Sequence, residues 1–284
     1  MIKVLKSGFY STIQDLGRYG YQDFGVPISG AMDGYSAHFA NALINNDKND
    51  AVLEITMIGP TLQFNCHTII CISGADLFPM LNNKEIKLNS IISVKPKDVL
   101  SFGKLNYGLR SYMAVKGGFQ TEFKLNSRSM FKNVTSKIKI ETNDDLQIIE
   151  ALPSDSSKYA SLKFNKAVFE SNIIEVYKGP EFGHLSPIQQ KQLFDQEFTI
   201  SNLNNRMAYQ LEGLFENDLT PIITSLVLPG TVQLTPSGNV IILMRDCQTT
   251  GGYPRILQLK ESSINCLAQK FKGQKIRFQL LNYN

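Results

Sequence analysis

The chain has 284 residues, 43% of them hydrophobic and 19% charged, which suits one large or two ordinary globular domains. The formal net charge is only +4, and lysine and arginine are scattered, which argues against nucleic acid as a partner. No apolar run is long enough for a signal peptide or a membrane span, and the four cysteines lack Cys-x-x-Cys spacing. We therefore expect a cytoplasmic protein with reduced thiols and no membrane association.

The first half of the chain predicts one helix followed by many short strands. A strand over residues 2–5 precedes a polar stretch, and a loop of turn-forming residues at 25–34 leads into a helix over residues 35–44. Asp33 or Ser36 is the expected N-cap of this helix. Short apolar runs separated by Gly, Pro and Asn then predict strands at residues 52–56, 61–64, 68–73, 86–94, 99–102 and 110–115. This spacing is typical of a barrel or sandwich.

The second half is also predicted to consist mainly of short strands, and it follows a linker expected at residues 153–158. A strand over 173–177 is followed by a helix from Ser186, with Pro187 at its first position and Gln189 completing a capping box. A short helix is expected at 263–269. The remaining predicted strands cover residues 226–228, 231–234, 240–244, 256–260 and 275–280.

The two halves also resemble each other weakly. Residues 2–6 align with 174–178, and Gly117-Gly118 aligns with Gly251-Gly252, with offsets that shrink in order along the chain. Coincidence is the alternative. The alignment predicts two copies of one β unit, residues 1–160 and residues 161–284.

Polar chemistry is concentrated in the loop that follows the predicted strand at 240–244. This loop carries hydroxyl, amide and charged side chains and ends in two glycines, which can adopt positive φ or admit a ligand. The polar residues are Arg245, Asp246, Gln248, Thr249 and Thr250. A small-molecule site and a self-satisfied polar turn are both consistent with this pattern. The three histidines have no metal-ligand spacing, so we expect no metal site.

Several longer motifs resemble the allophanate hydrolase subunit 2 family. They are Ser-Thr-Ile-Gln-Asp-Leu-Gly-Arg at 11–18, Gly-Val-Pro-Ile-Ser-Gly-Ala-Met-Asp at 25–33, Asn-Arg-Met-Ala-Tyr-Gln-Leu-Glu-Gly at 205–213 and Gln-Thr-Thr-Gly-Gly-Tyr-Pro-Arg at 248–255. The resemblance covers nearly the whole chain. It implies a mainly β fold of two cyclophilin-like β-barrel units with a few short helices.

The resemblance also implies an amidohydrolase subunit of an ATP-hydrolysing 5-oxoprolinase, active only with partner subunits, that opens 5-oxoproline to glutamate. The implied partners are a KipI-like B subunit and an A subunit. ATP is expected as a co-substrate, with Mg²⁺, and no tightly bound cofactor is expected. Two alternatives stay open: a carboxyltransferase-like domain acting on a urea-type amide, and a non-enzymatic regulator that binds and antagonises a KipI-like protein.

This chemistry needs cations for phosphate, donors for an oxyanion and a carboxylate that positions water or metal. We predict catalytic roles for Asp246, Gln248, Thr249 and Arg18. We predict substrate-binding roles for Asp15, Asp33, Asn205, Arg206, Thr250 and Gly251. An ion pair is the alternative for Arg18, and a helix cap for Asp33. The chain departs from the family at 126–130 and 132–145, where its usual glycines are missing.

Overall fold

The structure, a computed structural model, describes residues 1–152 and 163–282. The chain divides into two compact units, residues 1–18 with 29–165 and residues 19–28 with 166–284. The linker expected at 153–158 and the boundary expected between residues 160 and 161 lie outside the described residues. Within the described part of the chain, no helix is long and apolar enough to cross a membrane.

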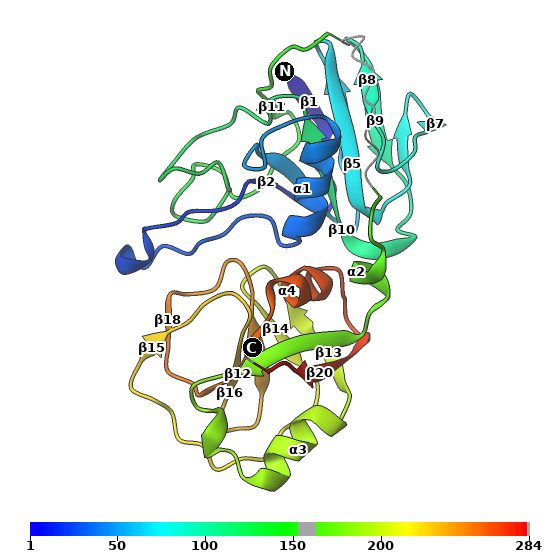
Figure 1. Cartoon of the computed structure of the whole chain (residues 1–284). Helices are drawn as coiled ribbons and strands as arrows, with labels where there is room; N and C mark the ends of the chain where they lie inside the picture. The colour runs from blue at the N-terminus through cyan, green and yellow to red at the C-terminus, as the bar shows by residue number, and fades with distance from the viewer. Residues whose placement is uncertain (153–162, 283–284) are drawn as a thin grey trace. The chain divides into compact units, whose positions relative to one another are not determined.

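The first unit is built from two β-sheets and one long helix (Figure 1). The six-stranded sheet has the order β11-β1-β4-β9-β6-β7, and the five-stranded sheet has the order β2-β3-β10-β5-β8. The strands are β1 Ile2–Lys6, β2 Tyr10–Gln14, β3 Val52–Thr56, β4 Thr61–Phe64, β5 Thr68–Asp76, β6 Pro79–Leu81, β7 Lys84–Glu85, β8 Ile92–Val94, β9 Val99–Phe102, β10 Tyr107–Val115 and β11 Asp145–Leu146.

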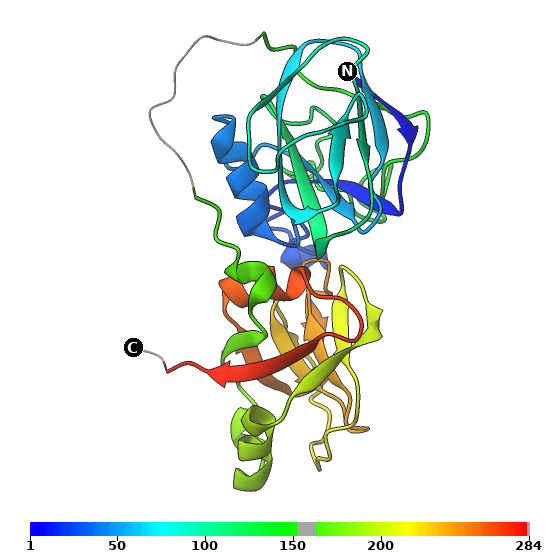
Figure 2. The ribbon, with the colours of Figure 1, turned by 90° about the vertical axis from the view of Figure 1, so that its right-hand side faces the viewer.

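Strand β10 shows how the core of the first unit is organised. Side chains alternate across a strand, so Met113 and Val115 enter a core shared with strands of both sheets. Tyr112 and Ala114 point to the other face, where they join the apolar side of helix α1 (Gly34–Leu43). Figure 2 shows α1 running beside these strands. Burial on both faces explains why this strand is a nearly continuous apolar run.

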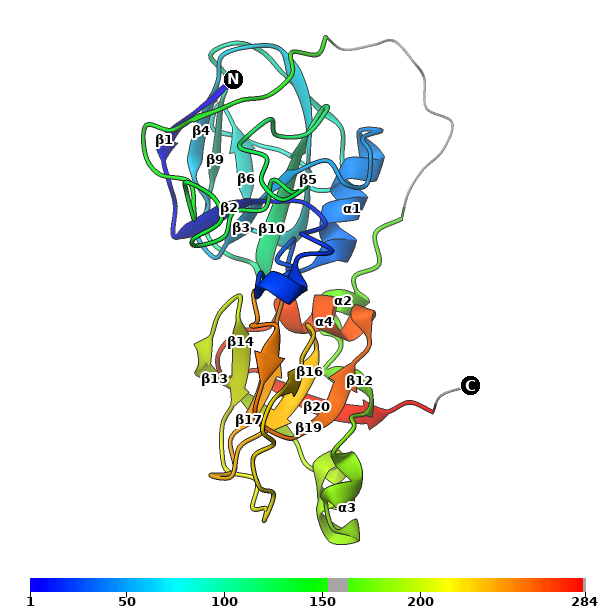
Figure 3. The same ribbon diagram turned by 90° about the vertical axis from the view of Figure 1, so that its left-hand side faces the viewer.

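The second unit is a closed barrel with the strand order β12-β19-β16-β17-β14-β13-β20 (Figure 3). The strands are β12 Ile173–Lys178, β13 Phe198–Asn204, β14 Ala208–Leu211, β16 Thr231–Leu234, β17 Val240–Leu243, β19 Arg255–Leu259 and β20 Lys275–Leu280, with β15 Ser225–Leu226 and β18 Thr250–Gly251 outside the barrel. In addition to α1, the described residues form the helical elements η1 Gln22–Phe24, α2 Ala167–Glu170, η2 Phe182–His184, α3 Pro187–Asp195 and α4 Glu261–Ala268. The expected mainly β fold is confirmed, and the second unit is a closed seven-stranded barrel.

The helix signals in the sequence are confirmed. Asp33, not Ser36, is the N-cap of α1, and its carboxylate accepts from the backbone N–H of Ser36. The capping box at Ser186 and Gln189 begins α3 as predicted.

One strand prediction was wrong, and one strand was not predicted. The run at 86–94 forms a strand only over β8, because a turn with Asn89 at φ 55° interrupts it. Residues 10–14, which lie in the polar stretch where no strand was predicted, form β2, which pairs antiparallel with β3. Its residues Ser11, Thr12 and Gln14 are buried, so β2 lacks the alternation of apolar and polar residues that predicts a half-buried strand.

Candidate functional site

The Gln-Thr-Thr-Gly-Gly loop leaves the closed barrel at the end of β17. Its second half forms β18, which pairs with β15, so that Gly251 faces Ser225 and Thr250 faces Leu226. The backbone N–H of Val227 also donates to the carbonyl of Thr249 at 3.1 Å. These bonds hold the loop in an extended shape while the side chains of Gln248 and Thr250 stay exposed and Thr249 is half-buried.

A buried ion pair holds the start of this loop. The guanidinium of Arg206 donates from Nε to Asp246 Oδ2 at 2.8 Å and from Nη2 to Asp246 Oδ1 at 3.0 Å. The two residues are 6% and 9% exposed. The backbone N–H of Asp246 donates to the carbonyl of Arg206 at 2.9 Å, so main chain and side chains join the same two residues. Both carboxylate oxygens of Asp246 are therefore engaged, which suits a positioning role.

Asn205 shapes the turn that presents Arg206. Its side-chain oxygen accepts from the backbone N–H groups of Met207 at 2.7 Å and Ala208 at 3.1 Å, as in an Asx turn. The carbonyl of Met207 accepts from the N–H of Met244, which brings this turn against the start of the polar loop. The structure thus joins Asn205 and Arg206 to Asp246.

The two glycines of the loop do not use positive φ, in contrast to Gly117 and Gly118, whose φ values are 75° and 69°. Gly251 instead allows a close approach. A Cβ atom at this position would lie 2.6 Å from Nε2 of the buried side chain of Gln233. The two Gly-Gly pairs that align in the sequence therefore serve different purposes in the two units.

The other arginines near the loop are also paired with carboxylates. Arg245 pairs with Glu261, and Arg255 forms bonds of 3.0 and 2.8 Å to the two oxygens of Glu181. These bonds from Arg255 lower the pKa of Glu181, and the same bonds raise the pKa of Arg255. The loop therefore presents mainly neutral donors to solvent, namely the amide of Gln248 and the hydroxyl of Thr250.

Asp15, in the first unit, is the centre of a buried hydrogen-bond cluster. Its Oδ1 accepts from the hydroxyls of Ser127 and Ser129 at 2.7 Å each and from the N–H of Gly17 at 2.8 Å. Its Oδ2 accepts from the N–H of Arg128 at 2.6 Å. Arg18 is fully buried, and its guanidinium donates to the carbonyl of Ser129. The segment that departs from the family's glycine pattern thus supplies the partners of Asp15 and Arg18.

A second buried network surrounds the loop that precedes α1. Glu54 Oε2 accepts from the hydroxyl of Tyr112 and from the N–H of Met32, both at 2.8 Å. The Tyr112 oxygen accepts from the N–H of Asp33 at 2.8 Å, and Arg110 lies 3.8 Å from Glu54. Burial, and then the charges of Glu54 and Asp33, raise the pKa of Tyr112 well above its ordinary value, so it remains a donor at neutral pH.

The ten residues singled out from the sequence therefore fall into two sets, one in each unit. Asp15, Arg18 and Asp33 belong to the first unit, and the remaining seven belong to the second. Sequence reasoning missed Ser127, Ser129 and Tyr112, which hold the first set in place. The Ser-x-Ser spacing at 127–129 was visible, but nothing local connects it to Asp15, 112 residues away.

Cys247 lies inside the polar loop but is poorly suited to act as a nucleophile. It is 4% exposed, and burial, followed by the charge of Asp246, raises the pKa of its thiol to about 12. Across residues 1–152 and 163–282, no group of three or more His, Cys, Asp or Glu side chains is arranged to hold a metal ion.

Comparison with known proteins identifies relatives over nearly the whole chain. The family described as carboxyltransferase domain, subdomain A and B, matches residues 24–280. The chain is 32% identical to the C subunit of 5-oxoprolinase from Escherichia coli, over 98% of this chain and 90% of that protein. It is 30% identical to the C subunit of 5-oxoprolinase from Haemophilus influenzae, over 99% of this chain and 92% of that protein.

Longer proteins contain a similar region. The crystal structure of urea amidolyase from Kluyveromyces lactis superposes with a TM-score of 0.88 and 27% identity, over 99% of this chain but only 19% of that chain. Urea amidolyase of Saccharomyces cerevisiae is 26% identical, and the aligned region is 17% of that protein.

Proposed function

Since the chain belongs to the carboxyltransferase domain family, subdomains A and B, we propose that it is the C subunit of a 5-oxoprolinase. Together with A and B subunits, it opens 5-oxoproline to glutamate with hydrolysis of ATP. The observation that carries this proposal is the match to two bacterial 5-oxoprolinase C subunits along 90% and 92% of their own length. Urea amidolyase, in contrast, is matched along 17% of its length.

The reaction requires an amide carbonyl to be activated. Transfer of a phosphoryl group from ATP to the carbonyl oxygen creates a leaving group, and water then opens the ring. Neutral donors directed at the developing oxyanion stabilise such a step in a site that excludes water. In the proposal, the exposed amide of Gln248 and the hydroxyls of Thr249 and Thr250 supply these donors, and Gly251 gives the buried side chain of Gln233 room to pack beneath the loop.

Arg206 and Asp246 have a positioning role in this scheme. Their bidentate pair fixes the residue two positions before Gln248, so it sets the direction in which the loop leaves the barrel. In the first unit, Asp15 fixes the segment that carries Arg18, and Asp33 begins α1. Arg18 is fully buried and donates to the carbonyl of Ser129, so we assign it a positioning role as well.

The pairing of the loop's arginines supports a need for partner subunits. Arg206, Arg245 and Arg255 each bind a carboxylate of the same unit, so their charges are already balanced locally. The phosphates of ATP require cations, and Mg²⁺ with ATP uses one or two carboxylates together with phosphate oxygens. In the proposal, part of this set comes from the B subunit.

The test is glutamate production from 5-oxoproline and ATP by the chain mixed with its B and A partners. Each single omission is run beside the full mixture, and we expect turnover only when all three chains are present. Gln248→Ala lowers turnover by about 10²–10³-fold if its amide meets the oxyanion. Gln192→Ala, an exposed glutamine on α3, is the matched control and leaves turnover unchanged.

The second candidate is carboxyl transfer to a urea-type amide, and the family name and the superposition on urea amidolyase favour it. Turnover of urea with a carboxybiotin carrier, and none of 5-oxoproline, would replace the first proposal by this one. A stable complex with the B subunit and no turnover of either substrate would support a regulatory protein.

A further inference from the structure

The segment that carries the Gln-Thr-Thr-Gly-Gly loop has few apolar contacts with the barrel. We refer to the paired residues 222–227 and 249–252 as the flap. Val227 joins a buried cluster of three residues with Leu243 and Cys247, whereas Leu226 is 70% exposed and Ile223 is fully exposed. A segment with so little buried apolar surface opens easily unless polar bonds hold it.

Arg255, the last residue of the long motif at 248–255, supplies such a bond. Its Nε and Nη2 donate to Oε2 and Oε1 of Glu181 at 3.0 and 2.8 Å, and its Nη1 donates to the carbonyl of Leu226 at 2.9 Å. A guanidinium is a planar fork, so the bidentate bond to the carboxylate fixes the direction of Nη1. Leu226 pairs with Thr250, so this third bond holds the flap two residues away from Gln248.

The carboxylate that orients Arg255 is itself held on the start of β19. The N–H of Arg255 donates to Oε2 of Glu181 at 2.8 Å, and the N–H of Glu181 donates to the carbonyl of Arg255 at 3.2 Å. Gly179 permits this close approach, since a Cβ atom there would lie 2.2 Å from the carbonyl oxygen of Arg255. Glu181 is therefore a rigid support for the guanidinium.

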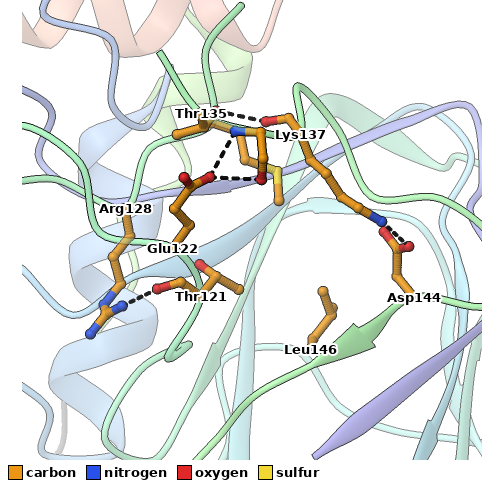
Figure 4. Close-up of a pocket in the computed structure, with 9 residues that line it drawn as sticks. Thr121, Glu122, Arg128, Thr135, Lys137, Asp144 and Leu146 are labelled. Atoms are coloured by element: carbon orange, nitrogen blue, oxygen red, sulfur yellow. Dashed lines mark hydrogen bonds and ion pairs between the residues drawn. The ribbon is translucent and has the colours of Figure 1, made fainter.

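The polar bonds around the pocket in Figure 4 are local by comparison. Lys137 pairs there with Asp144, seven positions away, and the guanidinium of Arg128 donates to the carbonyl of Thr121, also seven positions away. The side-chain bonds of Arg255 reach residues 74 and 29 positions away. They therefore connect three separate segments of the second unit.

We propose that Arg255 is a positioning residue for the Gln-Thr-Thr-Gly-Gly loop. Through Leu226 it holds the flap against the barrel, and it thereby keeps the amide of Gln248 and the hydroxyl of Thr250 in place for the substrate. What the loop does for the substrate rests on the proposed function, whereas the anchoring is a property of this chain. Arg245 has no such place, because its side chain donates to Glu261 and Asn265 of the α4 helix.

Amide hydrogen exchange of the full chain tests the anchoring. The N–H of Ile222 donates to Gly252 at 2.9 Å and that of Val227 to Thr249 at 3.1 Å, so both amides report on the flap. Arg255→Met removes the bond to Leu226, and we expect both amides to exchange about tenfold faster. The amide of Met244, at the start of the loop, keeps its rate. Arg245→Met is the matched control and leaves flap exchange as in the wild type.

A second variant tests whether Glu181 acts through Arg255. Glu181→Gln keeps the guanidinium but weakens its support, so we expect a smaller acceleration at the same two flap amides. The double variant should exchange no faster than Arg255→Met alone, because Glu181 has no other route to the flap in this scheme. Equal flap exchange in the wild type and Arg255→Met overturns the proposal, and so does an equal acceleration at Met244.

Turnover with the A and B partners connects the anchoring to the reaction. We expect Arg255→Met to lower kcat for 5-oxoproline about tenfold, and to have little effect in a Gln248→Ala background, because a positioning residue acts through the group that it positions. Losses that multiply in the double variant overturn the link to Gln248. Absence of turnover in the wild-type mixture rejects the proposed function, and the exchange rates still decide whether Arg255 anchors the flap.

Discussion

The Arg206–Asp246 pair supports the sharpest prediction for the second unit. Asp246→Asn keeps the shape of the side chain but removes the charge and at least one of the two hydrogen bonds at 2.8 and 3.0 Å. Removing one partner of a buried ion pair costs about 3–5 kcal/mol. The side chains of Arg206 and Asp246 retain 7% and 12% exposure. We therefore take the lower end, about 3 kcal/mol, because solvent screens part of the charge left behind.

The assay is urea denaturation of the wild type, Asp246→Asn, Arg206→Met and the double variant. We expect the sum of the losses of unfolding free energy in the two single variants to exceed the loss in the double variant. The difference is the coupling energy, which we expect to be about 2 kcal/mol. In thermal denaturation the Asp246→Asn loss corresponds to a fall in Tm of roughly 10 °C for a domain of this size. The exposed pair of Lys275 and Glu197, at 3.3 Å, is the matched control. Glu197→Gln changes stability by about 0.5 kcal/mol or less.

Additive single losses would refute the reasoning, because they would mean that the two charges do not depend on each other. A coupling energy comparable to that of the exposed control pair would do the same. Retained turnover in a folded Asp246→Asn variant, together with lost turnover in Gln248→Ala, would support the positioning role of Asp246 over a direct catalytic one.

Three further predictions follow from the same unit. Gly251→Ala lowers the free energy of unfolding by about 1–3 kcal/mol, because the added Cβ meets Gln233. The loss largely disappears in a Gln233→Ala background, and urea denaturation with and without each substitution measures both effects. Arg255 lowers the pKa of Glu181, so the folded state gains stability above the ordinary carboxyl value of 4.5 and loses it as pH falls through the lowered pKa. The stability difference between the wild type and Glu181→Gln should therefore shrink below pH 4.5, and a constant difference would contradict it. Cys247, with its thiol pKa raised to about 12, should resist alkylation by iodoacetamide in the native protein at pH 8 and react after unfolding, as peptide mass analysis will show.

Local patterns in the sequence were sufficient for much of the fold. The capping box at Ser186 and the cap at Asp33 are short-range signals, because the atoms that interact are three residues apart. The segments at 231–234 and 240–243 form strands at the expected positions, and the second is the continuous apolar stretch that is typical of a buried strand. The long motif at 248–255 likewise indicated the family, which the comparisons confirm.

The partners of the candidate site residues depended on the tertiary structure alone. Arg206 and Asp246 were each singled out from the sequence, but their pairing joins residues 40 positions apart. Ser127 and Ser129 reach Asp15 across more than a hundred residues, and they lie in the segment that departs from the family pattern. Such contacts form only when the sheets bring distant strands and loops together, so no periodicity or spacing in the chain predicts them.

The same reason explains the strand that was missed. Residues 10–14 read as polar and irregular, yet β2 is buried because β3 supplies its backbone partners and Met130 accepts from Gln14 through its carbonyl oxygen. By itself, the sequence determined the mainly β class, the helix starts, the family and the residues that carry polar chemistry. The tertiary structure decided which of these side chains are exposed to a substrate and which are already bound to one another, because burial and pairing are properties of the folded chain.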